Sequence, residues 1–576
     1  MAAPPNGRVL PPSFDINTFD KVMDAMATIV GSDNVSRDSF HGNLGGPGGE
    51  LFYGDIWPMG DTTDHTPSGA IRPKSVDEVQ EIVKVANRYK LPLWTVSRGK
   101  NLGYGASGAV VRGSVILDLH RMNKIIEVSE EHAYAIVEPG VSFFDLYNYI
   151  QAKGYRLWPS CPALGWGSVL GNTLERGFGY TPNGEHAEQQ CGMEVMLGTG
   201  EVVRTGMGAL PGSPMWPLFK GGYGPSIDGL FYQSNLGIVT KLGIHLTPAP
   251  ASFALCELSV PSQDQLISMV RTLAHLEREN VIQNHTSISN PFRRALADLT
   301  TCPDLVPRVL GPGLQSGGGC ATNADMTALA KERGWGYWTG DFALYAASPA
   351  ILDANWALVH ERIAAAGISG ACVKITFRAD AAPNERLNAS KLAVPSEYTA
   401  IPQYGVPGTQ NASLMETRGG PNAKGNGHIC FSPLFSTDGI EMQAWWDRAQ
   451  QMAEDARFDV FADFHVYGRY VLAIALVVYR PHDEGERVKG LFERWLEDAE
   501  KHGVSEYRTH LDYMDRVRGQ FNWPGGSGVG AEAGGGQERG KQDALGQVLR
   551  RLKGVLDPEG ILGQGKSGIW TVPART

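Results

Sequence analysis

The sequence has little positive charge, few cysteines and no long apolar run, and each of these absences argues against a class of protein. Its 576 residues contain 51 lysines and arginines against 61 aspartates and glutamates, and the net charge of −10 disfavours binding to nucleic acid. The longest apolar run, residues 471–479, is much shorter than the roughly 20 residues that span a bilayer. We therefore expect no membrane segment and interpret this run as a buried strand.

The cysteines and the N-terminus together indicate where the protein is found. The 7 cysteines are odd in number and unclustered, which is typical of reduced thiols. The first residues lack the apolar core of a secretory signal. We expect a cytoplasmic protein. No G-x-S-x-G, H-E-x-x-H or C-x-x-C motif occurs, so serine hydrolase and zinc chemistry have no support and we expect no metal site.

The apolar periodicity predicts a mixture of helices and strands. Ser75 has the character of an N-cap, and Glu78 follows it in a pattern of helical spacing. Strict alternation of strand and helix is not seen, so the elements form a mixed α/β pattern and not the regular alternation of a doubly wound fold. Helices are predicted over residues 74–90, 142–153, 263–279, 351–366 and 541–556, and strands over residues 93–96, 114–119, 134–138, 370–376 and 471–479.

A loop dense in glycine, residues 97–108, directly follows the apolar segment 93–96. Its four glycines allow backbone conformations and close approaches that a Cβ would forbid, so successive N–H groups can form an anion-binding nest. Three of them fit the G-x-G-x-x-G spacing. The dinucleotide fingerprint also requires a helix after the loop, whereas a strand is predicted at 114–119. The loop therefore predicts a pyrophosphate site that is not of the Rossmann type.

Together with its neighbours, this segment resembles the FAD-binding domain of the vanillyl-alcohol oxidase and p-cresol methylhydroxylase family, which includes eugenol oxidase-like enzymes. The resemblance implies an α+β fold in which a p-cresol methylhydroxylase-type FAD-binding domain is joined to an α+β cap domain. The co-linear blocks that carry it are residues 137–147, 167–186, 191–197, 204–212, 231–243, 506–515 and 556–570.

The chain is longer than a single core usually supports, so we expect more than one domain. Residues 1–252 are assigned to the N-terminal part of the FAD-binding domain and residues 253–500 to the cap. Residues 501–576 are assigned to a C-terminal return to the FAD-binding domain, interrupted by a glycine-rich loop at 525–540. The cap begins where the sequence changes character, and the return begins where the family blocks resume.

The resemblance implies that the chain binds FAD. His428 aligns with the histidine that carries a covalent link to the 8α carbon of FAD in vanillyl-alcohol oxidase, whereas the tyrosine attachment of the p-cresol enzymes would fall at Gly420. Pro162 matches a position over the flavin that is associated with oxygen access. The residues implied to contact FAD are His428, Arg98, Gly99, Lys100, Asn101, Leu102, Gly103, Gly105, Pro162, Gly171, Asn172, Glu175, Gly179, Tyr180, Gly237, Ile238, Val239 and Lys566.

The resemblance also implies that Tyr104, Tyr507 and Arg508 bind the phenolic oxygen of a para-substituted phenol as its phenolate. A phenol has a pKa of about 10, and two hydroxyl donors and a guanidinium lower that value. The phenolate then pushes electrons through the ring, so that the benzylic hydrogen leaves as hydride to flavin N5 and a p-quinone methide forms. Water adds to this intermediate, or a further proton is lost to give an alkene.

We therefore expect an FAD-dependent oxidase of 4-alkylphenols, 4-allylphenols or 4-hydroxybenzylic alcohols, with O₂ as the acceptor and H₂O₂ as a product. The alternative is a dehydrogenase or hydroxylase that passes electrons to a cytochrome or another acceptor. A 2-hydroxy acid or sugar oxidoreductase and a flavoprotein without turnover are further alternatives. By analogy with the family, we expect a homodimer or a larger homo-oligomer.

Three positions near the implied pocket leave questions open. Ala163 stands where vanillyl-alcohol oxidase has an aspartate that steers water addition and assists flavin attachment, so covalent attachment and product stereochemistry are not settled. Glu416 matches an acidic residue of both branches and fits a surface carboxylate equally well. His465 can face the pocket, although a core histidine is the more common role for such a residue.

Overall fold

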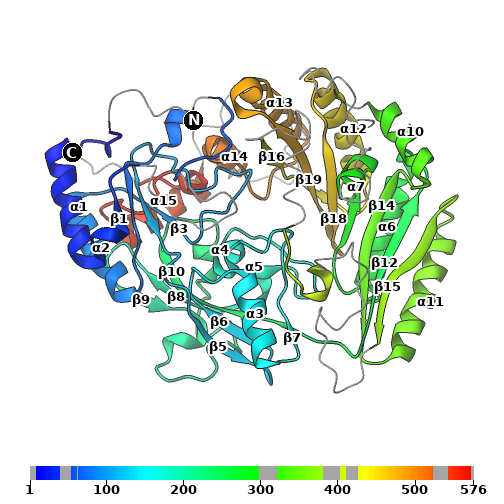
Figure 1. Cartoon of the computed structure of the whole chain (residues 1–576), viewed down its shortest axis with the longest axis horizontal. Coiled ribbons are helices and arrows are strands. Elements are labelled where there is room, and N and C mark those ends of the chain that lie inside the picture. Colours follow the sequence, from blue (N-terminus) through cyan, green and yellow to red (C-terminus); the bar gives the residue numbers. More distant parts are fainter. Residues whose placement is uncertain are drawn as a thin grey trace.

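The computed structural model describes residues 8–38, 53–60, 62–297, 320, 322–380, 402–409, 426–522 and 543–571. Helices and sheets occur together, which confirms the predicted α+β class, and the chain folds into two lobes that lie side by side (Figure 1). The first lobe contains the segments up to β11 together with the C-terminal segments. The second lobe contains β12 to α13. None of the described helices is long and apolar enough to cross a membrane.

Two sheets form the scaffold of the first lobe. In the four-stranded sheet, with the order β1-β2-β4-β3, strand β4 pairs in parallel with both β2 and β3. The five-stranded sheet has the order β5-β6-β10-β8-β9 and is antiparallel, and β7 and β11 form a separate short pair. The strands are β1 Val35–Ser36, β2 Gly69–Ile71, β3 Leu93–Val96, β4 Val115–Asp118, β5 Ile125–Ser129, β6 Tyr134–Val137, β7 Leu157–Trp158, β8 Gln190–Met196, β9 Val202–Arg204, β10 Ile238–His245 and β11 Thr247–Pro248.

Two helices of this lobe, α2 and α3, begin directly after serine capping residues. Ser75 accepts a hydrogen bond from the Glu78 amide at 3.2 Å and so caps α2, whose apolar stripe is buried as the periodicity predicts. Ser142 caps α3 in the same way, with Asp145 completing a capping box. The helices are α1 Ile16–Val30, α2 Val76–Tyr89, α3 Phe143–Lys153, α4 Val169–Leu174, α5 His186–Gln189, α14 Met514–Gln520 and α15 Ala544–Leu556.

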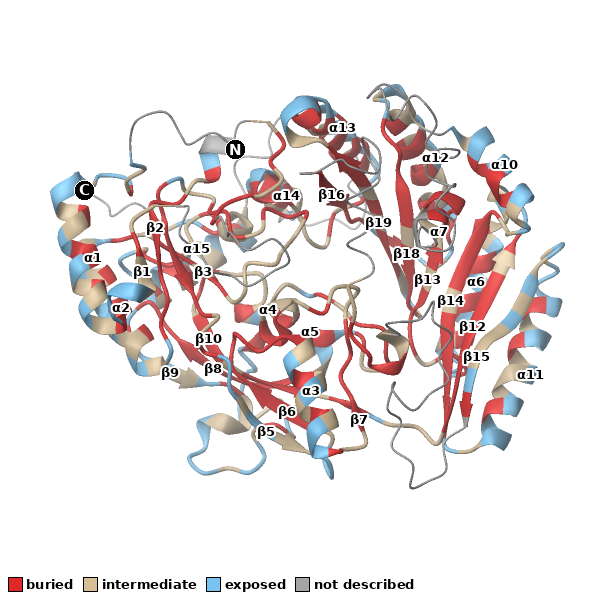
Figure 2. Cartoon of the chain, viewed as in Figure 1, coloured by how far each residue is buried: buried red, intermediate tan, exposed pale blue. Residues whose placement is uncertain are grey.

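The second lobe is built on one antiparallel sheet of eight strands. Seven follow the order β15-β12-β14-β13-β18-β19-β16, and β17 also pairs with β19. Its strands β12, β14, β16, β18 and β19 are buried along most of their length, as Figure 2 shows, and four tryptophans (Trp338, Trp445, Trp446 and Trp495) fill the core beside them. The strands are β12 Ser252–Val260, β13 Thr286–Ser289, β14 Trp338–Ala346, β15 Cys372–Asp380, β16 Gly427–Phe431, β17 Leu434–Ser436, β18 Phe461–Val466 and β19 Tyr470–Tyr479. The helices are α6 Leu266–Arg278, α7 Pro291–Ala297, α10 Asn323–Arg333, α11 Pro349–Ala365, α12 Ile440–Asp455 and α13 Pro481–Lys501.

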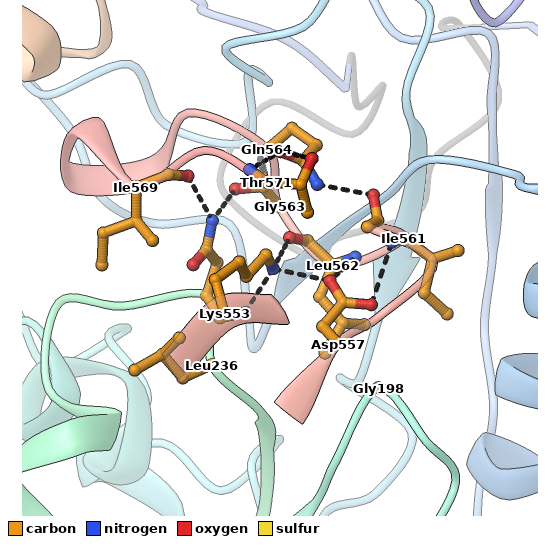
Figure 3. A network of polar contacts seen from close by, with 12 residues as sticks. Gly198, Leu236, Lys553, Asp557, Ile561, Leu562, Gly563, Gln564, Ile569 and Thr571 are labelled. Carbon is orange, nitrogen blue, oxygen red and sulfur yellow. Dashed lines mark hydrogen bonds and ion pairs between the residues drawn. The ribbon is translucent and has the colours of Figure 1, made fainter. Parts of the chain in front are cut away.

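The last segment of the chain returns to the first lobe and extends its sheet. Leu93 in β3 donates to the Ile561 carbonyl and accepts from the Gly563 amide, both at 2.7 Å. A buried ion pair of 2.6 Å between Lys553 and Asp557 fixes this turn: Lys553 also donates to the Leu562 carbonyl, and Asp557 accepts from the Ile561 and Leu562 amides (Figure 3). The segment is thereby held against the strand that leads into the glycine loop.

A second buried network joins the C-terminal return to the beginning of the first lobe. His510 lies 3.0 Å from Asp55 and 3.4 Å from Asp512, and Asp512 also contacts His65 at 2.5 Å. Burial acts to lower the pKa of His510, but the two carboxylates outweigh it and raise the pKa to about 10. His510 is therefore charged at neutral pH and fastens residues 510–512 to the first lobe.

Replacement of His510 by asparagine is expected to destabilise the protein by about 3 kcal/mol near pH 6, because Asp55 keeps its buried charge without a partner. The pKa of His510 is about 10 in the folded protein and 6.5 in the reference state, so its stabilisation is complete below pH 6.5 and is lost as the pH rises toward 10. Urea unfolding of both proteins between pH 6 and pH 10 measures this. A difference between them that grows with pH would contradict the assignment.

Candidate active site

A cavity with a solvent-accessible volume of about 360 Å³ lies between the two lobes. The first lobe contributes loops that follow its strands and helices, and the second lobe contributes one face of its sheet. The polar side chains that line it from the second lobe are Arg293, His428, Asp463 and His465. The described residues contain no group of three or more histidine, cysteine or acidic side chains that could hold a metal ion.

The alternation of strand residues explains which side chains of the second lobe reach the cavity. Successive residues of a strand point to opposite faces of the sheet. In β16, His428 and Cys430 line the cavity while Ile429 and Phe431 belong to the helix-covered core. The strands β18 and β19 alternate in the same manner: Asp463, His465, Ile474 and Leu476 line the cavity, whereas Ala462, Phe464, Ala473, Ala475 and Val477 lie in the core.

The glycine loop after β3 forms the opposite wall. Gly99, Gly103 and Gly105 have φ of 61°, 78° and 100°, conformations that L side chains rarely adopt. Among the described residues, none accepts a hydrogen bond from the amides of residues 98–103, so these donors are available to a ligand. A Cβ on Gly103 would come within 2.7 Å of His428 Nε2, so the loop and β16 meet where the imidazole lies. His428 is buried, and burial lowers its pKa to about 4.

Residues 162–180 form a third wall. Lys566 makes an ion pair with Glu175 and approaches the ring of Trp94 at 5.8 Å. Arg98 uses its guanidinium to hold the backbone of this wall, donating to the carbonyls of Trp166 and Gly140 at 3.0 and 2.8 Å. Ala163 also lines the cavity. The aspartate that vanillyl-alcohol oxidase has at this position is therefore absent from the wall.

Tyr104, Tyr507 and Arg508 come together at one end of the cavity. Arg508 lies over the ring of Tyr104 at 4.2 Å and over that of Tyr507 at 5.4 Å. Backbone pairing brings the distant segments together: the Tyr507 amide donates to the Ser432 carbonyl at 3.1 Å, and Ser432 Oγ lies 2.8 Å from the Tyr104 hydroxyl. Glu506 accepts from the Ser432 amide at 3.0 Å, and burial raises the pKa of this carboxyl to about 8.

The electrostatics of this cluster are those of an anion site. Burial raises the pKa of Tyr104 and that of Tyr507, so both hydroxyls stay protonated. Burial acts to lower the pKa of Arg508, but the two tyrosines outweigh it, and the guanidinium stays charged. Arg508 forms no ion pair with any described residue. The Tyr507 hydroxyl and Arg508 Nε are buried and find no hydrogen-bond partner in the part of the chain that is described.

Most of the residues predicted from the sequence lie around this cavity. The exceptions are Gly103, Gly105, Gly179 and Tyr507, which are close by without lining it, and Glu416, which lies outside the described residues. The glycine-rich loop at 525–540 also lies outside them. The predicted residues that line the cavity are Arg98, Gly99, Lys100, Asn101, Leu102, Tyr104, Pro162, Ala163, Gly171, Asn172, Glu175, Tyr180, Gly237, Ile238, Val239, His428, His465, Arg508 and Lys566.

Two charged lining residues were not predicted. Arg293 lies in α7 and Asp463 lies in β18. Arg293 Nη2 is 3.8 Å from Asp463 Oδ2. The sequence signal for Asp463 is its place two residues before His465 in a strand, because residues so spaced share a face. Arg293 carries no comparable local signal, since α7 meets β18 only in the folded chain.

Comparison with known proteins gives the class of this chain. Residues 67–206 match the FAD binding domain family, and residues 409–567 match the C-terminal domain of FAD linked oxidases. The protein is therefore an FAD-linked oxidoreductase.

Relatives that match along their whole length are more specific. The chain is 33% identical to the 4-cresol dehydrogenase [hydroxylating] flavoprotein subunit of Pseudomonas putida, over 98% of each chain. Its structure matches a 4-ethylphenol oxidase from Gulosibacter chungangensis (TM-score 0.82, 29% identity, 98% of this chain and 100% of that one). It matches p-cresol methylhydroxylase with substrate bound equally well (TM-score 0.82, 32% identity, 98% and 99%). The chain belongs to the vanillyl-alcohol oxidase and p-cresol methylhydroxylase family, which confirms the resemblance seen in the sequence.

The cavity fits FAD. The free amides of residues 98–103 form a cradle suited to a pyrophosphate. Glycine is required where the walls come closest, since a Cβ on Gly171 would lie 2.2 Å from Ser97 Oγ and one on Gly237 would lie 2.5 Å from a methyl of Val195. His428 reaches the same space from the second lobe as a neutral imidazole.

Proposed function

We propose that this protein oxidises para-substituted phenols, removing hydride from the benzylic carbon, and that O₂ is the final electron acceptor. The substrates are 4-alkylphenols, 4-allylphenols or 4-hydroxybenzylic alcohols. The observation that carries the proposal is the charged Arg508, which lies between two tyrosines at the cavity and has no ion-pair partner among the described residues. The names of the relatives, a cresol dehydrogenase and an ethylphenol oxidase, support the same substrate class.

An uncompensated guanidinium favours a ligand that brings a negative charge. Leaving a charge unpaired away from water costs several kcal/mol, and a bound phenolate offsets this cost. The Tyr507 hydroxyl and Arg508 Nε have unused donor capacity, and the aromatic faces of the cluster suit a ring. A sugar substrate, also considered from the sequence, needs more polar groups than this end of the cavity provides, and the aromatic faces of the cluster favour a phenol over an aliphatic carboxylate.

The side chains here hold the phenol oxygen as an anion and thereby make the ring electron-rich. Electron density pushed from that oxygen weakens the benzylic C–H bond, so a hydride can leave and a p-quinone methide remains. Bound FAD supplies the acceptor for this hydride at N5. The chain also orients the substrate. Arg508 fixes the phenol oxygen, so the carbon in the para position points away from Arg508.

FAD is held by the glycine loop, by residues 162–180 and by Lys566. We propose that His428 carries a covalent bond to the 8α carbon. A neutral imidazole is the nucleophilic form, and the burial that lowers the pKa of His428 to about 4 maintains this form at neutral pH. Because residue 163 is alanine, this chain lacks the carboxylate that assists covalent attachment of FAD in the family. The proposed attachment therefore depends on His428.

The electron acceptor distinguishes two versions of the proposal. Pro162 lines the cavity at the position that the family associates with oxygen access, which supports an oxidase. The relative from Pseudomonas putida is named a flavoprotein subunit, which supports the alternative of transfer to a redox protein such as a cytochrome. A homodimer or larger homo-oligomer is part of the proposal in either version.

Anaerobic mixing with 4-ethylphenol, followed by admission of air, tests the proposal. Bleaching of the flavin by the phenol is expected, followed by reoxidation with one H₂O₂ formed for each flavin. Absence of bleaching would refute oxidation of phenols. Bleaching followed by slow reoxidation, made fast by an added cytochrome or dye, would instead establish the dehydrogenase.

Replacement of Arg508 by methionine is expected to raise the dissociation constant of 4-alkylphenols by about 10- to 100-fold, because a charge-assisted hydrogen bond contributes about 1.5–3 kcal/mol. Tyr507→Phe should act in the same direction with a smaller effect. Titration of the flavin absorbance with an unreactive phenol measures binding. Arg516→Met is the matched control, since this arginine of the same segment pairs with Glu500 and does not line the cavity. Equal affinities in the Arg508 and Arg516 variants would remove Arg508 from the phenol site.

Replacement of His428 by alanine is expected to release FAD when the protein is precipitated with acid, whereas the wild type keeps a yellow pellet. The absorbance of the supernatant measures this. Release of FAD from the wild-type protein as well would show that the cofactor is not covalently bound.

A further inference from the structure

We propose that His465 is the base that takes a proton from the water that adds to the benzylic carbon, and that Asp463 positions it. The inference rests on the proposed oxidation of phenols and concerns the step after hydride removal. Geometry carries it, because both side chains lie on the cavity face of β18.

The imidazole of His465 is a buried polar group without a structural use. The residue is fully buried, it lines the cavity, and neither ring nitrogen finds a hydrogen-bond partner among the described residues. Buried polar atoms are nearly always hydrogen-bonded, so these two nitrogens, which belong to a residue that lines the cavity, are available to a ligand or water there. The rings of Phe178 and Tyr180 pack against it at 4.3 and 5.9 Å and limit its orientation.

Asp463 completes a pair of the kind that orients catalytic histidines. Its Oδ1 lies 3.5 Å from His465 Nε2 and accepts a hydrogen bond of 2.5 Å from the Ser287 hydroxyl. Arg293 Nη2 lies 3.8 Å from the other oxygen of the same carboxylate, Oδ2. With Nε2 turned toward Asp463, Nδ1 is the nitrogen left to accept a proton. Such contacts are commonly long without substrate and shorten as the imidazole becomes charged.

The electrostatic surroundings keep this base in its working form. Burial lowers the pKa of His465, Asp463 acts to raise it and Arg293 to lower it. The other titratable groups that face the ring are His285 and Tyr180, and Tyr180 has its pKa raised by burial. His465 is therefore neutral at pH 7 before the reaction begins.

The alanine at position 163 creates the need for such a residue. In this family the resemblance assigns the steering of water to an aspartate at that position, and alanine has no proton acceptor. Asp463 and His465 lie on the second lobe, where the His465 ring contacts Phe178 of the wall formed by residues 162–180. The structure thus supplies a base from β18 in place of one from the first lobe.

The proposed step is balanced without any further oxidant, because the two electrons have already left as hydride. Nδ1 of His465 takes one proton from water while the water oxygen bonds to the benzylic carbon. The electron pair of the exocyclic C=C bond moves into the ring and returns to the ring oxygen, which Arg508 holds as phenolate. The imidazolium then gives its proton to solvent as the alcohol leaves.

Product analysis after a single turnover of the holoprotein with 4-ethylphenol tests the proposal. The quinone methide yields 1-(4-hydroxyphenyl)ethanol by water addition or 4-vinylphenol by proton loss. His465→Leu is expected to lower the ratio of alcohol to vinylphenol at least roughly tenfold, in line with the usual contribution of a base. Asp463→Asn should lower it less. The rate of flavin bleaching, which precedes water addition, is measured in the same experiment, so an effect on hydride removal is separated from an effect on the product ratio.

His285→Leu is the matched control. This histidine belongs to the same buried aromatic cluster but does not line the cavity, so its loss should leave the product ratio unchanged. A second readout needs no turnover: calorimetric binding of 1-(4-hydroxyphenyl)ethanol to dithionite-reduced protein. His465→Leu should weaken this binding roughly fivefold, the value of a neutral hydrogen bond, and His285→Leu should not.

An unchanged or increased alcohol fraction in His465→Leu would overturn the proposal, as would an equal shift in His285→Leu. If His465→Leu does not fold, Asp463→Asn and His465→Gln decide in the same way. Failure of the wild type to bleach with 4-ethylphenol would be a failure of the proposed function, and it is distinguishable because bleaching is measured separately.

Discussion

A charged guanidinium held between two tyrosine rings, without a carboxylate partner among the described residues, is the constraint on which the active-site architecture depends. Arg508 keeps its charge beside Tyr104 and Tyr507 only because the surrounding chain holds all three in place. The backbone bond from Tyr507 to Ser432 and the buried His510 network provide this support. The site is therefore preorganised for an anion that the protein itself does not contain.

The sheet of the second lobe connects folding and chemistry directly. Each of β16, β18 and β19 alternates between the tryptophan-rich core and the cavity, so one strand residue stabilises the lobe while its neighbour faces the ligand. A shift of register by one residue would exchange the two sets. Tight packing of the core thus fixes the position of His428, Asp463 and His465 relative to the glycine loop of the other lobe.

The two lobes divide the work of the reaction. The first lobe provides the cradle for the cofactor, in which glycine backbone and free amides replace side chains. In the proposed mechanism, the second lobe provides the groups that exchange protons or form a bond to the flavin. In that mechanism the first lobe has only alanine at position 163, and the Asp463–His465 pair supplies the base from the second lobe. Enzymes that share one fold can form different products when the position of the base changes, because the hydride transfer itself does not depend on that base.

The sequence by itself determined the local structure and the identity of the fold: the cap of α2 by Ser75, the strand and glycine loop at 93–108, the α+β class and most of the predicted residues that line the cavity. These follow from interactions within a few residues or from motifs that the family shares. Only the tertiary structure decided that Arg293 and His285 surround the Asp463–His465 pair, and that Asp512 contacts His65, 447 residues away. Such pairings depend on how sheets and helices pack after they form, and no local pattern of residue types encodes them.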